Sequence, residues 1–185
     1  MPESPDQPLS FTGQLLVAHP SLHDPNFRRS VLFISAHNTT EGAMGVILNR
    51  PLDKQVSELV PHATPGDLGD VPVYAGGPVG TNELMFAALD WQENSGLILN
   101  QNLPLRSAIS PHDDPSGGIR AFVGYAGWTA GQLEKELEQQ AWILRKPDPA
   151  ALAPERLPKL WFEIMRGLGP YFKMLAAAPD DPSLN

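Results

Sequence analysis

Cysteine, positive charge and long apolar runs are scarce or absent in this chain, and each absence excludes a class of protein. None of the 185 residues is cysteine, which excludes disulfides, thiol catalysis and cysteine-based zinc sites. No uninterrupted apolar run is long enough to cross a bilayer. Residues 1–10 have neither the basic region nor the apolar segment of a secretory signal. We therefore expect a cytoplasmic protein without a membrane partner.

Acidic residues outnumber basic residues in the sequence as a whole. The chain has 13 Lys and Arg against 21 Asp and Glu, and its formal net charge is −8. Nonspecific binding to nucleic acid depends on Lys and Arg side chains that neutralise phosphates. Here no more than two basic residues are adjacent in sequence, and this occurs at Arg28-Arg29 and Arg145-Lys146. The sequence therefore predicts no specific nucleic-acid binding.

The glycine and histidine residues lack the spacing of known cofactor and metal sites. The glycines within residues 124–131 do not form the dinucleotide-binding pattern, and no lysine completes a phosphate-binding loop after residues 76–80. His19 and His23 have the four-residue spacing of a metal pair on a helix, but Pro20 argues against a helix there. We expect no cofactor, no metal and no assembled catalytic group.

Residues 119–144 carry the strongest local pattern. The segment opens with an apolar run typical of a buried strand, and Gly124 within the run predicts a bulge or a second backbone passing close by. Thr129 is the expected N-cap, with Gln132 completing a capping box. Apolar residues then recur at helical spacing: Leu133, Leu137, Ala141 and Leu144. A helix over 130–143 is predicted; the preceding glycines form either an anion site at its N-terminus or only a tight connection.

Other apolar segments alternate with turn residues along the chain. We expect strands at residues 11–18, 31–37, 43–49, 71–74, 84–89 and 97–99, a short helix at 54–60, and two final helices at 158–168 and 171–178. The strands at 31–37 and 43–49 predict a hairpin. Because both are apolar on both faces, we expect both faces to be covered. One domain is expected over 11–178, with mobile tails at 1–10 and 179–185.

Several short motifs occur together in one order. They are His19-Pro20-Ser21, Asp24-Pro25 with Phe27, Ser30-Val31, His37-Asn38, Gly42-Ala43-Met44-Gly45, Asn49-Arg50-Pro51, Tyr74 with Gly76-Gly77-Pro78-Val79, Gly124-Tyr125-Ala126-Gly127-Trp128, Gly131-Gln132-Leu133, Glu136 and Trp142. In this combination the chain resembles the YqgE/AlgH family of bacterial proteins.

The resemblance implies a single-domain α/β (α+β) fold with a bent, mostly antiparallel, barrel-like sheet flanked by helices. The family is largely uncharacterised and carries a provisional label as a transcriptional regulator. One segment departs from it. Similar proteins usually have a strand and a helix before the Gly124–Trp128 motif, whereas residues 100–118 here are rich in Pro, Asp and Gly and are expected to be shorter and loop-like.

Two kinds of function are compatible with these residues. The first is a non-catalytic binding or regulatory protein for an unknown protein or small molecule, because the motifs consist mainly of residues that shape backbone. The second is a small hydrolase in which His37 acts as a base beside Asn49 and Arg50. The hypothetical pocket comprises His37, Asn38, Asn49, Arg50, Gly76, Gly77, Gly127 and Trp128.

Three of these residues also have structural interpretations. His37 can be hydrogen-bonded within a turn, and Arg50 can pair with a buried carboxylate instead of an anionic ligand. Trp128 precedes the predicted helix and can pack against Leu133 one turn later. We expect Trp128 to stabilise the fold.

Overall fold

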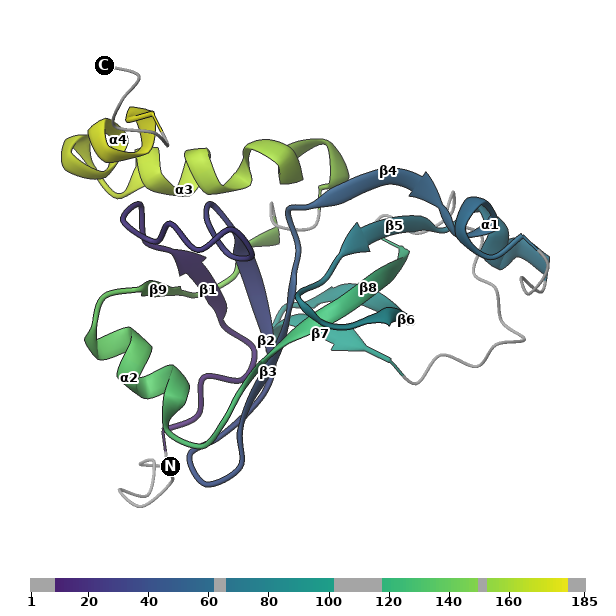
Figure 1. Cartoon of the computed structure of the whole chain (residues 1–185), viewed down its shortest axis with the longest axis horizontal. Coiled ribbons are helices and arrows are strands. Elements are labelled where there is room, and N and C mark those ends of the chain that lie inside the picture. The colour runs from purple at the N-terminus through teal and green to yellow at the C-terminus, as the bar shows by residue number, and fades with distance from the viewer. Residues whose placement is uncertain (1–8, 62–65, 102–117, 150–152, 180–185) are drawn as a thin grey trace.

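In the computed structural model, which describes residues 9–61, 66–101, 118–149 and 153–179, the chain forms one strongly bent sheet with helices packed around it (Figure 1). Its strands are β1 (Leu15–Ala18), β2 (Val31–Asn38), β3 (Gly42–Ile47), β4 (Pro51–Gln55), β5 (Pro72–Ala75), β6 (Val79–Gln92), β7 (Gly96–Asn100), β8 (Ile119–Trp128) and β9 (Trp142–Arg145). Its helices are α1 (Val56–Leu59), α2 (Gln132–Glu138), α3 (Leu160–Gly167) and α4 (Pro170–Ala177), with 3-10 helices η1 (Gly66–Asp70) and η3 (Pro154–Lys159). The expected single-domain α+β class is confirmed.

The strand order of the sheet is β4-β5-β8-β3-β2-β1-β9, and the β6–β7 hairpin joins it by pairing with β8. Among the described strands β5 and β8 run parallel, while the other pairs are antiparallel. The resemblance implied a bent, mostly antiparallel sheet, and the pairing confirms it.

Strand β8 connects the two halves of the sheet. Its first half lies between β5 and β6, and its second half pairs with β3. At the change of partner Gly124 has a φ of 71°, and a Cβ built there would lie 2.3 Å from the carbonyl oxygen of Gly77. The register with β6 also shifts between Val79 and Leu84. The predicted close backbone approach at Gly124 is therefore confirmed.

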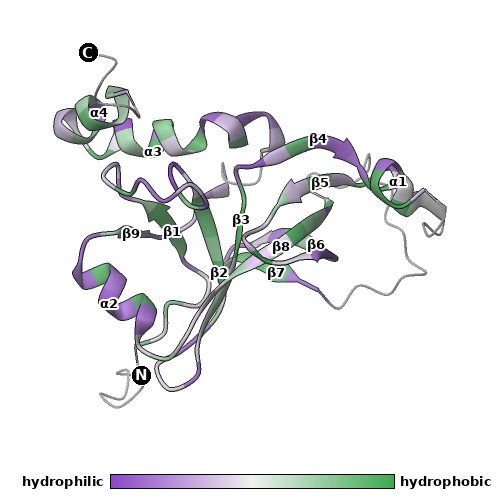
Figure 2. Cartoon of the chain, in the orientation of Figure 1, coloured by the Kyte–Doolittle hydropathy of each residue, from purple (hydrophilic) through white to green (hydrophobic). Residues whose placement is uncertain are grey.

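The hairpin of β2 and β3 is covered on both faces, as predicted. Val31 and Phe33 belong to the core cluster that includes α3, whereas Leu32 and Ile34 face the opposite cluster, which includes Leu133 of α2. Figure 2 shows the resulting hydrophobic strands at the centre of the molecule, with hydrophilic residues on α2 and β4. Two-sided burial explains why residues 31–34 and 46–48 are apolar at every position.

Helix α2 is shorter than the sequence predicted. It ends at Glu138, and Gln140 then adopts a left-handed φ of 58°. The following residues form β9, in which Leu144 pairs with Leu16 of β1. The expected helix over 130–143 was wrong at its C-terminal end because backbone pairing with β1 replaces the last helical turn. The N-cap is Gly131, although the Thr129 N–H still donates to the Gln132 side chain.

The C-terminal helices cover one face of the sheet (Figure 1). Leu160, Trp161 and Met165 of α3 are buried against the sheet. The Trp161 indole also donates to the carbonyl of Ala18, at 2.8 Å, and so fixes α3 to the end of β1.

Some expectations concern residues outside the described ranges. Residues 100–118 were expected to be loop-like, and 102–117 of them lie outside the described ranges. Most residues of the two predicted tails also lie outside these ranges. Ser10, at the end of the predicted N-terminal tail, donates its hydroxyl to the carbonyl of His37. Within the described ranges no helix is long and apolar enough to cross a membrane.

Candidate functional site

The hypothetical pocket of the sequence analysis divides between opposite ends of the β2–β3 hairpin. His37 pairs with Ala43 beside the hairpin turn, whereas the Asn49 side chain binds the N–H of Val31 at the other end. Val31 and His37 are six residue steps apart along β2, which corresponds to about 20 Å. The hypothesis that His37 lies beside Asn49 and Arg50 in one pocket is therefore wrong, because the return strand carries residue 49 away from residue 37.

His37 is held by two different partners. Its Nδ1 accepts the backbone N–H of Phe11 at 3.2 Å, so Nε2 carries the proton and donates to Glu134 Oε1 at 2.9 Å. The imidazole is fully buried and packs against the Phe11 ring, with the ring centroids 4.5 Å apart and the planes tilted by 35°. Asn38 beside it accepts from the N–H and the hydroxyl of Thr40. These contacts use both ring nitrogens to fix the N-terminal segment and α2 to β2.

Asn49 and Arg50 fix the loop between β1 and β2. Asn49 accepts the Val31 N–H at 2.8 Å and donates to the carbonyl of Arg29 at 2.9 Å. Arg50 donates to the carbonyl of Asn26 and, at 2.9 Å, to that of Arg28. The observed partners of Arg50 are thus carbonyl groups, where the sequence analysis considered a carboxylate or an anion.

Gly76 and Gly77 lie where β5 ends and the chain crosses β8. A Cβ on Gly76 would lie 2.3 Å from the carbonyl oxygen of Gly124, and one on Gly77 would lie 2.2 Å from the carbonyl group of Tyr125. Gly127 pairs with Met44 in the sheet. Gly76 and Gly77 permit close backbone contact, and the described cavities are lined by residues other than these three glycines.

Trp128 belongs to a buried cluster that the sequence did not predict in full. Glu136 Oε2 accepts both the Trp128 indole, at 2.9 Å, and the Trp142 indole, at 2.7 Å. Its other oxygen accepts from Gln132, and the Phe27 ring packs against both tryptophans. Trp128 is buried in the same cluster as Leu133, as predicted. All of these residues belong to the sequence motifs, but nothing in the spacing of the motifs indicated that the two indoles share the Glu136 carboxylate.

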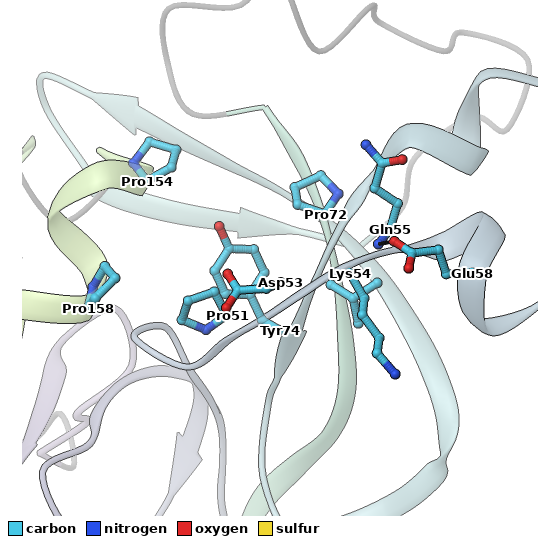
Figure 3. Close-up of a pocket in the computed structure, with 10 residues that line it drawn as sticks. Pro51, Asp53, Lys54, Gln55, Glu58, Pro72, Tyr74, Pro154 and Pro158 are labelled. Carbon is cyan, nitrogen blue, oxygen red and sulfur yellow. Dashed lines mark hydrogen bonds between the residues drawn. The ribbon is translucent and has the colours of Figure 1, made fainter.

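A cleft of about 590 Å³ lies between β4, β5 and η3 (Figure 3). Three separate segments line it: Pro51, Asp53, Lys54, Gln55 and Glu58; Pro72, Val73 and Tyr74; Pro154 and Pro158. Figure 3 shows Tyr74 among the prolines, with its phenol oxygen directed towards the open space. The volume of the cleft is within the range typical of small-molecule sites.

The chemistry of this cleft combines a rigid apolar floor with a charged rim. Tyr74 is 4% exposed, and the guanidinium carbon of Arg120 lies 5.2 Å from its ring centroid. Asp53 and Lys54 are exposed on β4, and Glu58 accepts the backbone N–H of Gln55 at the start of α1. The described lining has no Ser, Thr, Cys or His. Such a set can hydrogen-bond a ligand, and it contains no nucleophile activated by a histidine base.

Sequence reasoning missed the cleft for a physical reason. Its lining comes from three segments that meet only through the parallel pairing of β5 with β8 and the packing of η3. The available signal was the set of prolines that these segments carry, namely Pro51, Pro72, Pro154 and Pro158.

The fold and its sites define a small α+β protein with a bent, largely antiparallel sheet. A family model described as AlgH-like (DUF179) matches residues 15–173, and the chain belongs to this family. A UPF0301 protein of Streptomyces avermitilis is 37% identical, over 95% of this chain and 96% of its own length. A UPF0301 protein of Bacteroides fragilis is 33% identical, over 94% and 90%.

Two solved structures share the fold. A protein of Corynebacterium diphtheriae superposes with a TM-score of 0.68 and 25% identity, covering 95% of each chain. The AlgH protein of Pseudomonas aeruginosa superposes with a TM-score of 0.64 and 32% identity, covering 97% of this chain and 98% of its own. The family of the chain is thus shown, and the names of these relatives state no activity.

Proposed function

We propose that this protein is a non-catalytic binding protein whose ligand, a small polar molecule, occupies the cleft around Tyr74. One observation carries the proposal: prolines and an aromatic ring form a rigid cavity of suitable volume beneath a rim of charged side chains. Pre-formed concave sites with an apolar lining and a few polar groups are the usual form of small-molecule sites. A cytoplasmic location is part of the proposal.

The alternative hydrolase function has less support. It required His37, Asn49 and Arg50 in one pocket, and these side chains lie at opposite ends of the hairpin with separate hydrogen-bond partners. The regulatory role suggested by the family label fits the proposal if the ligand controls binding to another protein. The acidic charge of the chain favours a protein partner over nucleic acid.

A ligand screen by thermal shift tests the proposal. We expect some small polar compounds to raise the melting temperature of the wild-type protein, because a ligand that binds only the folded state stabilises it. Asp53→Asn should weaken the response, since it removes a rim charge while asparagine tolerates the left-handed φ of 52° at this position. Tyr74→Phe should weaken the response by removing the phenol oxygen.

Asp148→Asn is the matched control, because Asp148 is exposed and lies outside the cleft lining. It removes the same charge and should leave the response unchanged. Equal responses from Asp53→Asn, Tyr74→Phe and the control would count against the cleft as the binding site.

A further inference from the structure

Three arginines gather around a second cavity, although the chain as a whole is acidic. This cavity has a volume of about 390 Å³ and lies between the β1–β2 loop, the end of β3 and the start of α3. We refer to it as the arginine pocket, with the lining Pro25, Arg28, Arg29, Asn49, Arg50, Pro158, Trp161 and Phe162. Its described lining contains three cationic side chains and no carboxylate, in a chain with a net charge of −8.

The guanidinium of Arg50 is fixed at one wall of the pocket. Its two terminal nitrogens donate to the carbonyls of Asn26 and Arg28. These two bonds use only part of its donor capacity, because a guanidinium carries five N–H groups in one plane. Partial burial lowers the pKa of Arg50, and the positive charge of Arg28 lowers it further, while Asp24 acts in the opposite direction. Arg50 stays charged beside a second cation, and an anion would offset this repulsion.

The backbone that carries Arg28 and Arg29 is fixed as well. Asn49 accepts the Val31 N–H and donates to the Arg29 carbonyl, so both polar atoms of its side chain support the loop. Arg29 has a left-handed φ of 56°, a conformation uncommon outside glycine. The loop is thus held in one shape that places two successive arginines at the pocket.

Aromatic residues position the third cation. The guanidinium carbon of Arg29 lies 5.7 Å from the ring centroid of Trp161 and 5.2 Å from that of Phe162, within the range of cation–π contacts. Trp161 is itself fixed by its hydrogen bond to Ala18. The pocket therefore has a preorganised cationic wall and an aromatic wall, and Phe162 remains 39% exposed beside it.

We propose that the arginine pocket binds an oxyanion group, a phosphate or a carboxylate, on a ligand or partner. Guanidinium groups recognise both anions through paired hydrogen bonds of matching geometry. Arg28 and Arg50 supply the charge, Asn49 fixes the loop, and Phe162 offers a surface for an apolar part of the ligand. Pro158 lines both this pocket and the cleft around Tyr74, yet the inference rests on different residues and stands independently of the proposed function.

Titration of the isotope-labelled protein with inorganic phosphate, and separately with succinate, tests the inference by NMR, with chloride at matched ionic strength as the reference. We expect at least one of the two anions to cause saturable shifts in residues 25–30 and 49–50, with a dissociation constant of about 1 mM, typical of two charge-assisted hydrogen bonds. The anion that binds more tightly identifies the oxyanion class.

The variant Arg28→Gln should weaken this binding about tenfold, because it removes one charged donor group. Arg28 is exposed, so this substitution should leave the fold intact. Arg166→Gln is the control: Arg166 is also exposed, lies on α3 outside the pocket lining, and gives the same change in net charge. Its affinity should equal that of the wild type.

Arg50→Lys gives a second measurement, since lysine keeps the charge but lacks the planar pair of donors. A folded Arg50→Lys protein should bind the anion more weakly than wild type. The inference is overturned by the absence of saturable shifts with both anions, or by equal weakening in Arg28→Gln and Arg166→Gln. Because the pocket is probed with anions alone, failure here would leave the test of the Tyr74 cleft unaffected.

Discussion

Gly124 is the residue on which the geometry of the sheet depends most directly. We expect Gly124→Ala to destabilise the protein by about 2–5 kcal/mol, combining the cost of a left-handed φ with that of overpacking. The added Cβ would meet two backbone carbonyl oxygens, those of Gly77 at 2.3 Å and Val79 at 2.8 Å. Urea denaturation measures the effect.

Gly127→Ala is the matched control in the same strand. Its φ is not left-handed, and a Cβ there would lie at an ordinary 3.5 Å from its nearest neighbour, the Tyr125 ring. We expect a change of less than about 1 kcal/mol. Equal losses in both variants would contradict the role assigned to Gly124.

Trp128 stabilises the contact between β8, α2 and β9. We expect Trp128→Ala to cost about 3–5 kcal/mol, as is typical when a buried tryptophan is truncated, and to lower the melting temperature sharply. Trp128→Phe should cost less, because it keeps an aromatic ring but loses the indole bond to Glu136. If Trp128→Ala kept wild-type stability in a thermal melt, the stabilising role of Trp128 would be contradicted, and a role in ligand contact would be indicated instead.

At the scale of elements, the boundary between α2 and β9 depends on Gln140. Replacing it with glycine should raise stability by up to about 1 kcal/mol, because relief of the left-handed conformation at φ 58° exceeds the entropy cost of glycine. Gln139→Gly is the control. Gln139 has an ordinary φ of −79°, so glycine there should lower stability by a similar amount. Urea denaturation of both variants checks the pair, and the same sign in both would refute this account.

This boundary also shows what the sequence could predict about elements. Leu133 and Leu137 gave a correct helical period, but Ala141, just before β9, and Leu144, within β9, continued that period by coincidence. A short apolar segment fits a helix turn or a strand equally well, and here the pairing of β9 with β1 decides between them. The β2–β3 hairpin was predictable because its two strands and turn lie together in sequence.

At the scale of the whole molecule, sequence alone predicted local structure better than sites. The bent sheet followed from the family resemblance, and β8 from its own residues. Both cavities were missed, because their walls come from segments distant in sequence: residues 51–58 with 72–74 and η3 in one case, residues 25–29 with 49–50 and α3 in the other. Asn49 and Arg50 were predicted to lie beside His37, whereas they lie at the other end of the hairpin and line the arginine pocket.

The charge of the whole molecule predicts its behaviour towards DNA. We expect no sequence-dependent binding to duplex DNA with a dissociation constant below about 1 µM at physiological salt, where specific DNA-binding proteins bind far more tightly. A fluorescence anisotropy titration over a library of duplexes measures this. A tight, sequence-dependent response would show that the three arginines suffice for a DNA site despite the net charge of −8.

The central claim, that the protein binds a small polar molecule around Tyr74 without transforming it, is tested most directly by NMR chemical-shift mapping of the strongest compound from the thermal-shift screen. We expect the largest shifts in residues 51–58, 72–74 and 154–158, and we expect the spectrum of the compound to be unchanged after prolonged incubation. Largest shifts elsewhere in the chain, or conversion of the compound to a product, would contradict it.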